Sequence, residues 1–184
     1  MPTDDFRSAY LRDIARTFRN YKALGERAIA QASDSDLHTL VDPDANNIAI
    51  IVKHLAGNLR SRFTDFLTTD GEKPTRNRDA EFEMPEQAPR AEMMQWWESS
   101  WKMTLDTIDA LTPDDLDRTV YVRREAFLVV ESLNRLATHT AYHVGEIVLL
   151  AKHFAGPTWT SLSVPKGRSA DVKGEFKKGF IPTR

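Results

Sequence analysis

The stretch from Glu131 to Phe154 reads ESLNRLATHTAYHVGEIVLLAKHF, and it decides the fold more than any other part of the chain. Its apolar side chains recur every three or four residues, which predicts an amphipathic helix that ends before Gly156. His139 and His143 are four residues apart, so on a helix both imidazoles project from one face. On a helical wheel, His143 falls within the apolar stripe and His139 at its margin. The segment therefore predicts a pair of histidines at the edge of the core.

Three other segments share this periodicity and predict an all-α fold with four long helices. They cover residues 6–32, about 44–67 and about 89–108. Pro43 and Asp44 supply a stop and an N-cap before the second helix, and Pro89 is suited to open the third. Residues 69–88 are polar and contain turn signals, which predicts a long loop. Residues 119–130 predict either a small hairpin or an extended lead into the last helix.

Length and composition predict one domain over residues 1–184, with a C-terminal extension from about residue 156. A hydrophobic content of 41% and a charged content of 28% are typical of a globular protein, and a net charge of −2 gives no general attraction to nucleic acid. Met1 to Phe6 lack the pattern of a secretory leader, and the longest apolar runs are far shorter than a membrane span. We therefore expect a cytoplasmic protein with neither a nucleic-acid nor a membrane partner. The chain has no cysteine, so histidines and carboxylates are the candidate metal ligands.

His54 lies in the middle of the second predicted helix, on a face that is unusually polar for a strip beside the core. The same face carries Asn47, Ile51, Asn58 and Ser61. If it meets the face of His139 and His143, three neutral imidazoles converge on one divalent metal, such as zinc, nickel, copper or ferrous iron. Three protein ligands with an open position are typical of a catalytic metal site. The alternative is that these are hydrogen-bonded histidines at ordinary helix contacts.

These histidines and the motifs around them resemble the DinB/YfiT-like superfamily of metal-binding proteins over nearly the whole chain. The first motif is IVKHLAGNLRSR at residues 51–62, which continues as FTDFLTTDGEKP at residues 63–74. The others are Tyr142-His143-Val144-Gly145 and LSVPKGRS at residues 162–169. The resemblance is to a branch of unknown function within that superfamily, and it implies a four-helix bundle with a long crossover. It also implies that His54, His139 and His143 bind zinc, nickel or a similar ion.

Characterised members of that superfamily are similar to metal-dependent thiol transferases, which use a low-molecular-weight thiol such as bacillithiol, mycothiol or glutathione. Others resemble hydrolases or isomerases. The resemblance therefore implies a metal-dependent enzyme that acts on a small-molecule substrate, as a thiol S-transferase or a hydrolase. In the first case the metal would stabilise the cosubstrate thiolate, so no protein cysteine is required. In the second it would acidify a bound water, and a nearby carboxylate would take the proton.

Glu146, three residues after His143, is the candidate for that catalytic carboxylate. Related sequences often have glutamine after the Tyr-His-x-Gly motif. A glutamate there supplies a base or a fourth ligand, or it orients one of the histidines, or it is a plain surface charge. The polar residues that follow His54 are candidates for binding an anionic substrate, with surface ion pairs as the alternative. These candidates are Asn58, Arg60, Arg62, Arg76 and Arg78.

Two alternatives to an enzyme follow from the same residues. One is a noncatalytic small-molecule-binding or stress-response bundle, in which the metal serves stability or sensing. The other is a structural dimer whose buried histidines bind no metal. A homodimer is compatible with every reading, because Trp96, Trp97 and Trp101 of the third predicted helix offer aromatic surface.

Overall fold

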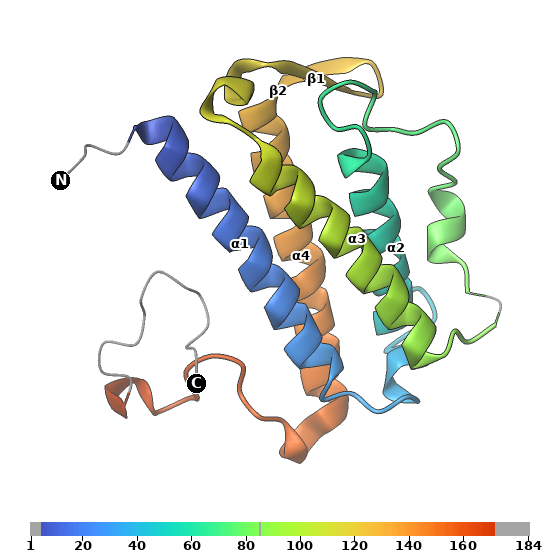
Figure 1. Ribbon diagram of the computed structural model, residues 1–184. Coiled ribbons are helices and arrows are strands. Elements are labelled where there is room, and N and C mark those ends of the chain that lie inside the picture. The colour runs from blue at the N-terminus through green and yellow to red at the C-terminus, as the bar shows by residue number, and fades with distance from the viewer. Residues whose placement is uncertain (1–4, 85, 172–184) are drawn as a thin grey trace.

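The computed structural model describes residues 5–84 and 86–171. Four long helices lie side by side, and a two-stranded hairpin lies across one end of them (Figure 1). The helices are α1 (Phe6–Ile29), α2 (Ile48–Phe63), α3 (Arg90–Ala110) and α4 (Val129–Ala155), and the strands are β1 (Thr119–Val122) and β2 (Glu125–Leu128). The prediction of a mostly helical chain is therefore confirmed, and of the two alternatives for residues 119–130 the structure shows the hairpin. In the part of the chain described, no helix is both long enough and apolar enough to cross a membrane.

The connection between α2 and α3 is long because of the directions of the helices. Both α2 and α3 point toward the hairpin, whereas α1 and α4 run away from it (Figure 1). The chain after residue 63 must therefore return along the whole molecule before α3 begins. On the way it forms a short 3-10 helix, η2 (Asp79–Phe82), which packs against α2. This crossover places a polar segment beside the middle of α2.

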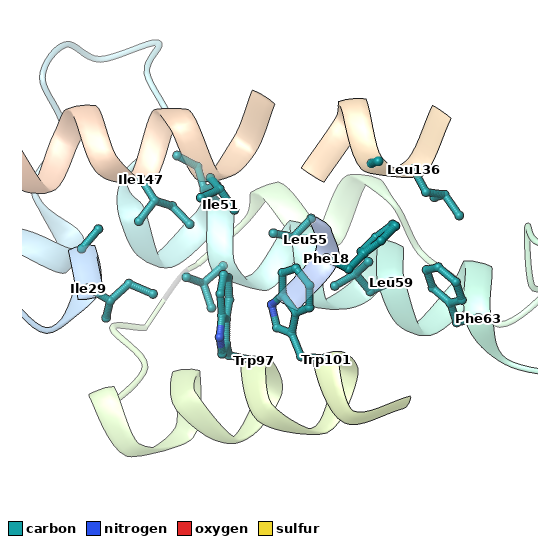
Figure 2. Close-up of a cluster of buried hydrophobic side chains, with 14 of the residues drawn as sticks. Phe18, Ile29, Ile51, Leu55, Leu59, Phe63, Trp97, Trp101, Leu136 and Ile147 are labelled. Atoms are coloured by element: carbon teal, nitrogen blue, oxygen red, sulfur yellow. The ribbon is translucent and has the colours of Figure 1, made fainter. Parts of the chain in front are cut away.

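The core lies between the four helices, and aromatic side chains fill its centre (Figure 2). Trp97 and Trp101 of α3 are both 0% exposed, and their ring centroids are 5.3 Å apart. Phe18 of α1 contacts Trp101 edge-on at 6.3 Å. These two tryptophans are thus core residues, and Trp96 is partly buried against the same core. A homodimer was expected because these tryptophans would offer aromatic surface. Trp97 and Trp101 offer none, because both are fully buried.

The second helix is shorter at both ends than the sequence predicts. It begins later and ends earlier. Its N-cap is Asn47, whose side chain accepts a hydrogen bond from the Ile50 amide over 2.9 Å, rather than Asp44. It ends at Phe63, four residues short of the predicted end, because the chain turns through Asp65 with a φ of 48°. Phe66 is nevertheless buried in the core. The apolar pattern continues past the helix because the turn also packs inward.

The hairpin is joined to the start of the crossover through a strained turn. Arg123 and Arg124 form the two-residue turn between the strands, and both have positive φ values, 55° and 67°. Residues other than glycine, asparagine and aspartate are uncommon in this conformation. The Asp70 carboxylate accepts hydrogen bonds from both backbone amides, over 2.9 and 2.7 Å. Asp70 therefore stabilises the turn and fixes the first part of the crossover in place.

The predicted C-terminal extension folds back on α1 after α4 ends. Gly156, with a φ of 53°, terminates the helix. Thr160 and Gln31 then exchange two hydrogen bonds, over 3.0 and 2.7 Å, and Leu162 is buried in the core. Residues 1–4 and 172–184 of the predicted single domain lie outside the described residues.

Candidate metal centre

The site begins with His54, which lies in the middle of α2 and is only 3% exposed. Its Nδ1 donates a hydrogen bond to Oε2 of Glu81, in η2, over 2.9 Å. An ionised carboxylate can only accept, so Nδ1 carries a proton, and in the neutral form of the ring Nε2 then keeps its lone pair. Phe82 packs against the same ring, with 4.5 Å between ring centroids. His54 is therefore held in the tautomer whose Nε2 can bind a metal.

Glu81 in turn is held by Arg76. Arg76 donates from Nε to Oε1 and from Nη2 to Oε2, each over 2.8 Å. Both side chains are almost fully buried. Burial alone would raise the pKa of the Glu81 carboxyl, but hydrogen bonds from Arg76 and His54 outweigh it and hold the pKa below its usual value. The carboxylate next to His54 therefore stays ionised at neutral pH.

Gly57 leaves the space that Glu81 occupies. A Cβ at position 57 would lie 2.4 Å from Oε1 of Glu81 and 2.7 Å from its Cδ. Glu81 cannot easily give way, because Arg76 and His54 bind its far end. A glycine inside a helix costs about 1 kcal/mol relative to alanine, so only the close approach explains its presence here.

We predict that Gly57→Ala lowers the free energy of unfolding by about 1–3 kcal/mol, although helix propensity alone predicts a gain. Gly145→Ala in α4 is the matched control, because a Cβ there meets nothing within 4 Å. That control should gain about 0.5–1 kcal/mol. Urea denaturation followed by circular dichroism measures both variants. Equal gains at the two positions would contradict the close contact with Glu81.

His139 and His143 lie one turn apart on α4 and face His54. The ring centroid of His54 is 4.8 Å from that of His143 and 5.5 Å from that of His139. The Nε2 atoms of His139 and His143 are 3.2 Å apart. Each of the three residues offers one nitrogen within 4.8 Å of the other two. The structure therefore brings together the three histidines that the sequence selects.

Glu146 contacts the side of His143 that points away from this cluster. The Nδ1 atom of His143 donates to Oε2 of Glu146 over 2.7 Å, which leaves Nε2 facing His139. The carboxylate also accepts a hydrogen bond from the Tyr142 hydroxyl, which raises the pKa of Tyr142. This geometry favours the reading of Glu146 as an acceptor that orients His143, over that of a base or a fourth ligand.

The surroundings keep the α4 histidines uncharged. Burial lowers the pKa of His139 to about 3, and the nearby His143, His54, Arg62 and Arg76 contribute in the same direction. Burial also lowers the pKa of His143, against the opposing effect of Glu146. Only the neutral imidazole binds a metal, so neither histidine has to lose a proton at neutral pH in order to do so.

The spacing of the nitrogens fits a small divalent metal. Zinc binds histidine nitrogen at about 2.0–2.1 Å with tetrahedral angles, so two ligand nitrogens then lie about 3.3 Å apart. The Nε2 atoms of His139 and His143 already have this separation, at 3.2 Å. Carboxylates on the Nδ1 atoms of His54 and His143 are also the usual outer partners of metal-binding histidines. Residues and geometry thus fit a zinc-like ion.

The five candidate substrate-binding residues occupy different places. Arg76 binds Glu81, and Arg62 binds Glu72 and the Gly71 carbonyl, so both are committed to contacts within the protein. Arg78 lies half-exposed over the Phe82 ring, with 4.9 Å between Cζ and the ring centroid. Arg60 is exposed on α2, and Asn58 is buried. Arg78 is therefore the candidate that lies at the rim of the histidine cluster.

Two residues of the site escaped the sequence analysis, Glu81 and Phe82. They lie in the crossover, where no periodicity indicates which side chains point inward. The nearest signal is Gly57, an isolated glycine within a strongly helical pattern, which indicates that another group approaches the helix closely at that point. Gly57 indicates that a group lies close to α2, but the sequence does not indicate that this group is Glu81.

Fold and site together define a mostly helical protein with a buried group of three histidines that can hold a metal ion. Residues 5–168 match the family described as "Protein of unknown function (DUF1572)". Because the match covers most of the chain, the protein belongs to this family. No curated protein matches the sequence.

Proposed function

We propose that this protein is a metalloprotein of the DinB/YfiT-like type, a four-helix bundle in which His54, His139 and His143 bind one divalent ion, zinc or nickel. The observation that carries the proposal is the convergence of three histidine nitrogens within 4.8 Å, two of them on rings already oriented by carboxylates. Three protein ligands leave a coordination position for a small molecule. The ion would act there as a Lewis acid.

The charges around the histidines favour an anionic ligand. Besides burial, Arg62 and Arg76 lower the pKa of His139, and Arg78 lowers that of His143. Arg62 and Arg76 are paired with Glu72 and Glu81, so the half-exposed Arg78 offers the charge that an anionic ligand would meet. The carboxylates that contact the cluster, Glu81 and Glu146, accept hydrogen bonds from Nδ1 atoms. Neither is placed to take a proton from a metal-bound water. We therefore favour a thiol S-transferase, whose cosubstrate binds as a thiolate, over a hydrolase.

The protein's own side chains have three tasks in this proposal. Glu81 and Glu146 keep the histidine Nε2 atoms directed at the ion. Phe82 covers one side of the site and excludes water from His54. Arg78, at the rim, attracts a carboxylate or another anionic group of the substrate. The ion itself would stabilise the thiolate near neutral pH.

Metal content tests the first part of the proposal. We expect about one ion per chain by elemental analysis after exposure to zinc, nickel, manganese and iron in turn, and no ion in His54→Ala, His139→Ala and His143→Ala. His153→Ala is the matched control, because His153 is an exposed histidine of the same helix as His139 and His143. It should bind as much metal as the natural sequence. If no metal binds under any condition, the proposal is wrong.

Thiol binding tests the second part. With cobalt(II) or nickel(II) in the site, addition of a low-molecular-weight thiol should produce an absorption band for charge transfer from thiolate to metal. His143→Ala should not show it. Metal binding without this band would favour the hydrolase. A loss of helix content on chelation, measured by circular dichroism, would favour an ion that serves stability alone.

A further inference from the structure

The three histidines differ in what their Nδ1 atoms contact. Those of His54 and His143 donate to Glu81 and Glu146. The Nδ1 atom of His139 is buried and has no hydrogen-bond partner among residues 5–84 and 86–171. If His139 binds a metal through Nε2, its Nδ1 must carry the proton and needs an acceptor. His139 therefore lacks the hydrogen-bond acceptor that the other two histidines have in Glu81 and Glu146.

Asn58 has a buried acceptor that lacks a donor. Its side chain is 7% exposed, and its Oδ1 is buried with no donor within the described ranges. A buried polar atom without a hydrogen-bond partner is destabilising, so an unpartnered oxygen of Asn58 and an unpartnered nitrogen of His139 on neighbouring helices call for an explanation. The sequence marks Asn58 as a substrate-binding candidate, but its burial points to a role inside the protein.

The helix geometry places Asn58 on the level of His139. Asn58 lies one turn after His54 on the same face of α2, and His139 lies one turn before His143 on α4. The two helices run in opposite directions and pack against each other (Figure 1). The His54 ring is nearer to that of His143 than to that of His139. One turn further along α2, toward the hairpin, the antiparallel helices therefore place Asn58 on the level of His139.

We propose that Oδ1 of Asn58 accepts a hydrogen bond from Nδ1–H of His139 when the metal is bound. Asn58 is then the positioning residue for the third ligand, equivalent to Glu81 for His54 and Glu146 for His143. This inference rests on the proposed metal site. An amide oxygen fits this place, because it can accept the one hydrogen bond that Nδ1–H of a metal-bound His139 donates.

Thr140 is the competing partner, because its Oγ1 is also buried and has no hydrogen-bond partner in the described part of the chain. Thr140 follows His139 directly on α4, so its side chain leaves the helix about 100° away from that of His139. A helical threonine can instead turn its hydroxyl to the carbonyl four residues earlier. Thr140→Val removes this hydroxyl at nearly constant volume and serves as the matched control.

The experiment measures the dissociation constant for zinc by competition with a chelating dye. Asn58→Leu should weaken zinc binding about 10–100-fold, which is the usual cost of losing an outer partner. Asn58→Asp, which keeps an acceptor, should bind within a few-fold of the natural sequence, and Thr140→Val within about twofold. Asn58→Ala, which removes the acceptor without adding apolar bulk, should show the same loss as Asn58→Leu. A loss in Asn58→Leu alone would report disturbed packing and overturn the inference. The unfolding midpoint of each metal-free variant shows that it is folded.

A spectroscopic readout identifies the atom involved. In the zinc-bound protein, a long-range ¹H–¹⁵N spectrum of histidine side chains should show a protonated, slowly exchanging Nδ1 in His139, and Asn58→Leu should lose its protection. Undiminished zinc binding by both Asn58→Leu and Asn58→Ala would overturn the inference and leave the metal site intact. Weaker binding by Thr140→Val alone would overturn it in favour of Thr140. If the natural sequence binds no zinc, the proposed function fails, and this inference fails with it.

Discussion

Replacing Glu81 with glutamine is expected to lower the free energy of unfolding and to weaken zinc binding at the proposed site. Removing one partner of a buried ion pair costs about 3–5 kcal/mol, because the other charge stays buried without compensation. The lower value is expected here, since Glu72 remains 3.5 Å from Nη1 of Arg76. Glutamine also no longer fixes the His54 tautomer through a charge, so zinc binding should weaken about 10–100-fold. Urea denaturation and dye competition measure the two effects.

A double variant separates the two roles of Glu81. Glu81→Leu combined with Arg76→Met removes both charges, and well-packed apolar side chains in place of a buried pair are often neutral for stability. We expect the stability to return toward that of the natural sequence while zinc binding stays weak. Asp79→Asn, which affects an exposed pair with a separation of 3.9 Å, is the control and should change the free energy of unfolding by less than about 0.5 kcal/mol. Recovery of both properties in the double variant would contradict a role for Glu81 in orienting His54.

Replacing Trp101 with alanine should cause the largest loss of stability that does not involve the histidines. Its side chain is fully buried between Trp97 and Phe18 (Figure 2). Substitution of a buried tryptophan by alanine costs about 3–5 kcal/mol through lost burial and a residual cavity. The fraction that remains folded should bind zinc normally, because α3 contributes no residue to the cluster. Denaturation curves and zinc titration at low temperature test this prediction.

Phenylalanine at the same position is the matched control. Within the described ranges, Nε1 of Trp101 is buried and has no hydrogen-bond partner, so Trp101→Phe removes an unsatisfied donor and keeps most of the ring. We expect a loss of less than about 1.5 kcal/mol. Trp97 differs, because its Nε1 donates to Glu26 over 3.3 Å, and Trp97→Phe should cost more than Trp101→Phe. The reverse order would contradict the assignment of these two environments.

The cluster of three histidines was predictable from the sequence because residues at a fixed spacing on a helix point in a fixed direction. Two histidines four residues apart must share a helix face, and His54 lies in the middle of another helix with its own polar strip. The two faces meet because α2 and α4 are neighbours in the structure. The position of Glu146 on His143 follows from the same rule, since the two residues are three apart.

The roles of the arginines were not predictable in the same way. Arg76 and Arg62 lie in or next to a polar stretch, where the sequence does not indicate whether a charge faces solvent, a substrate or another side chain. In the structure both bind carboxylates inside the protein, and Arg78 lies at the rim. Their partners Glu81 and Glu72 come from a segment without periodic structure, and its path depends on what it packs against.

The sequence by itself determined the four helices and the two helix faces that carry His54, His139 and His143. These properties depend on local periodicity, which each segment specifies without reference to the others. The tertiary structure alone decided that Glu81, held by Arg76, reaches His54, that Gly57 makes room for Glu81, and that Asn58 is buried. The physical reason is that these contacts join residues far apart in sequence through an irregular crossover, and their positions are fixed only when α2 and the crossover pack together.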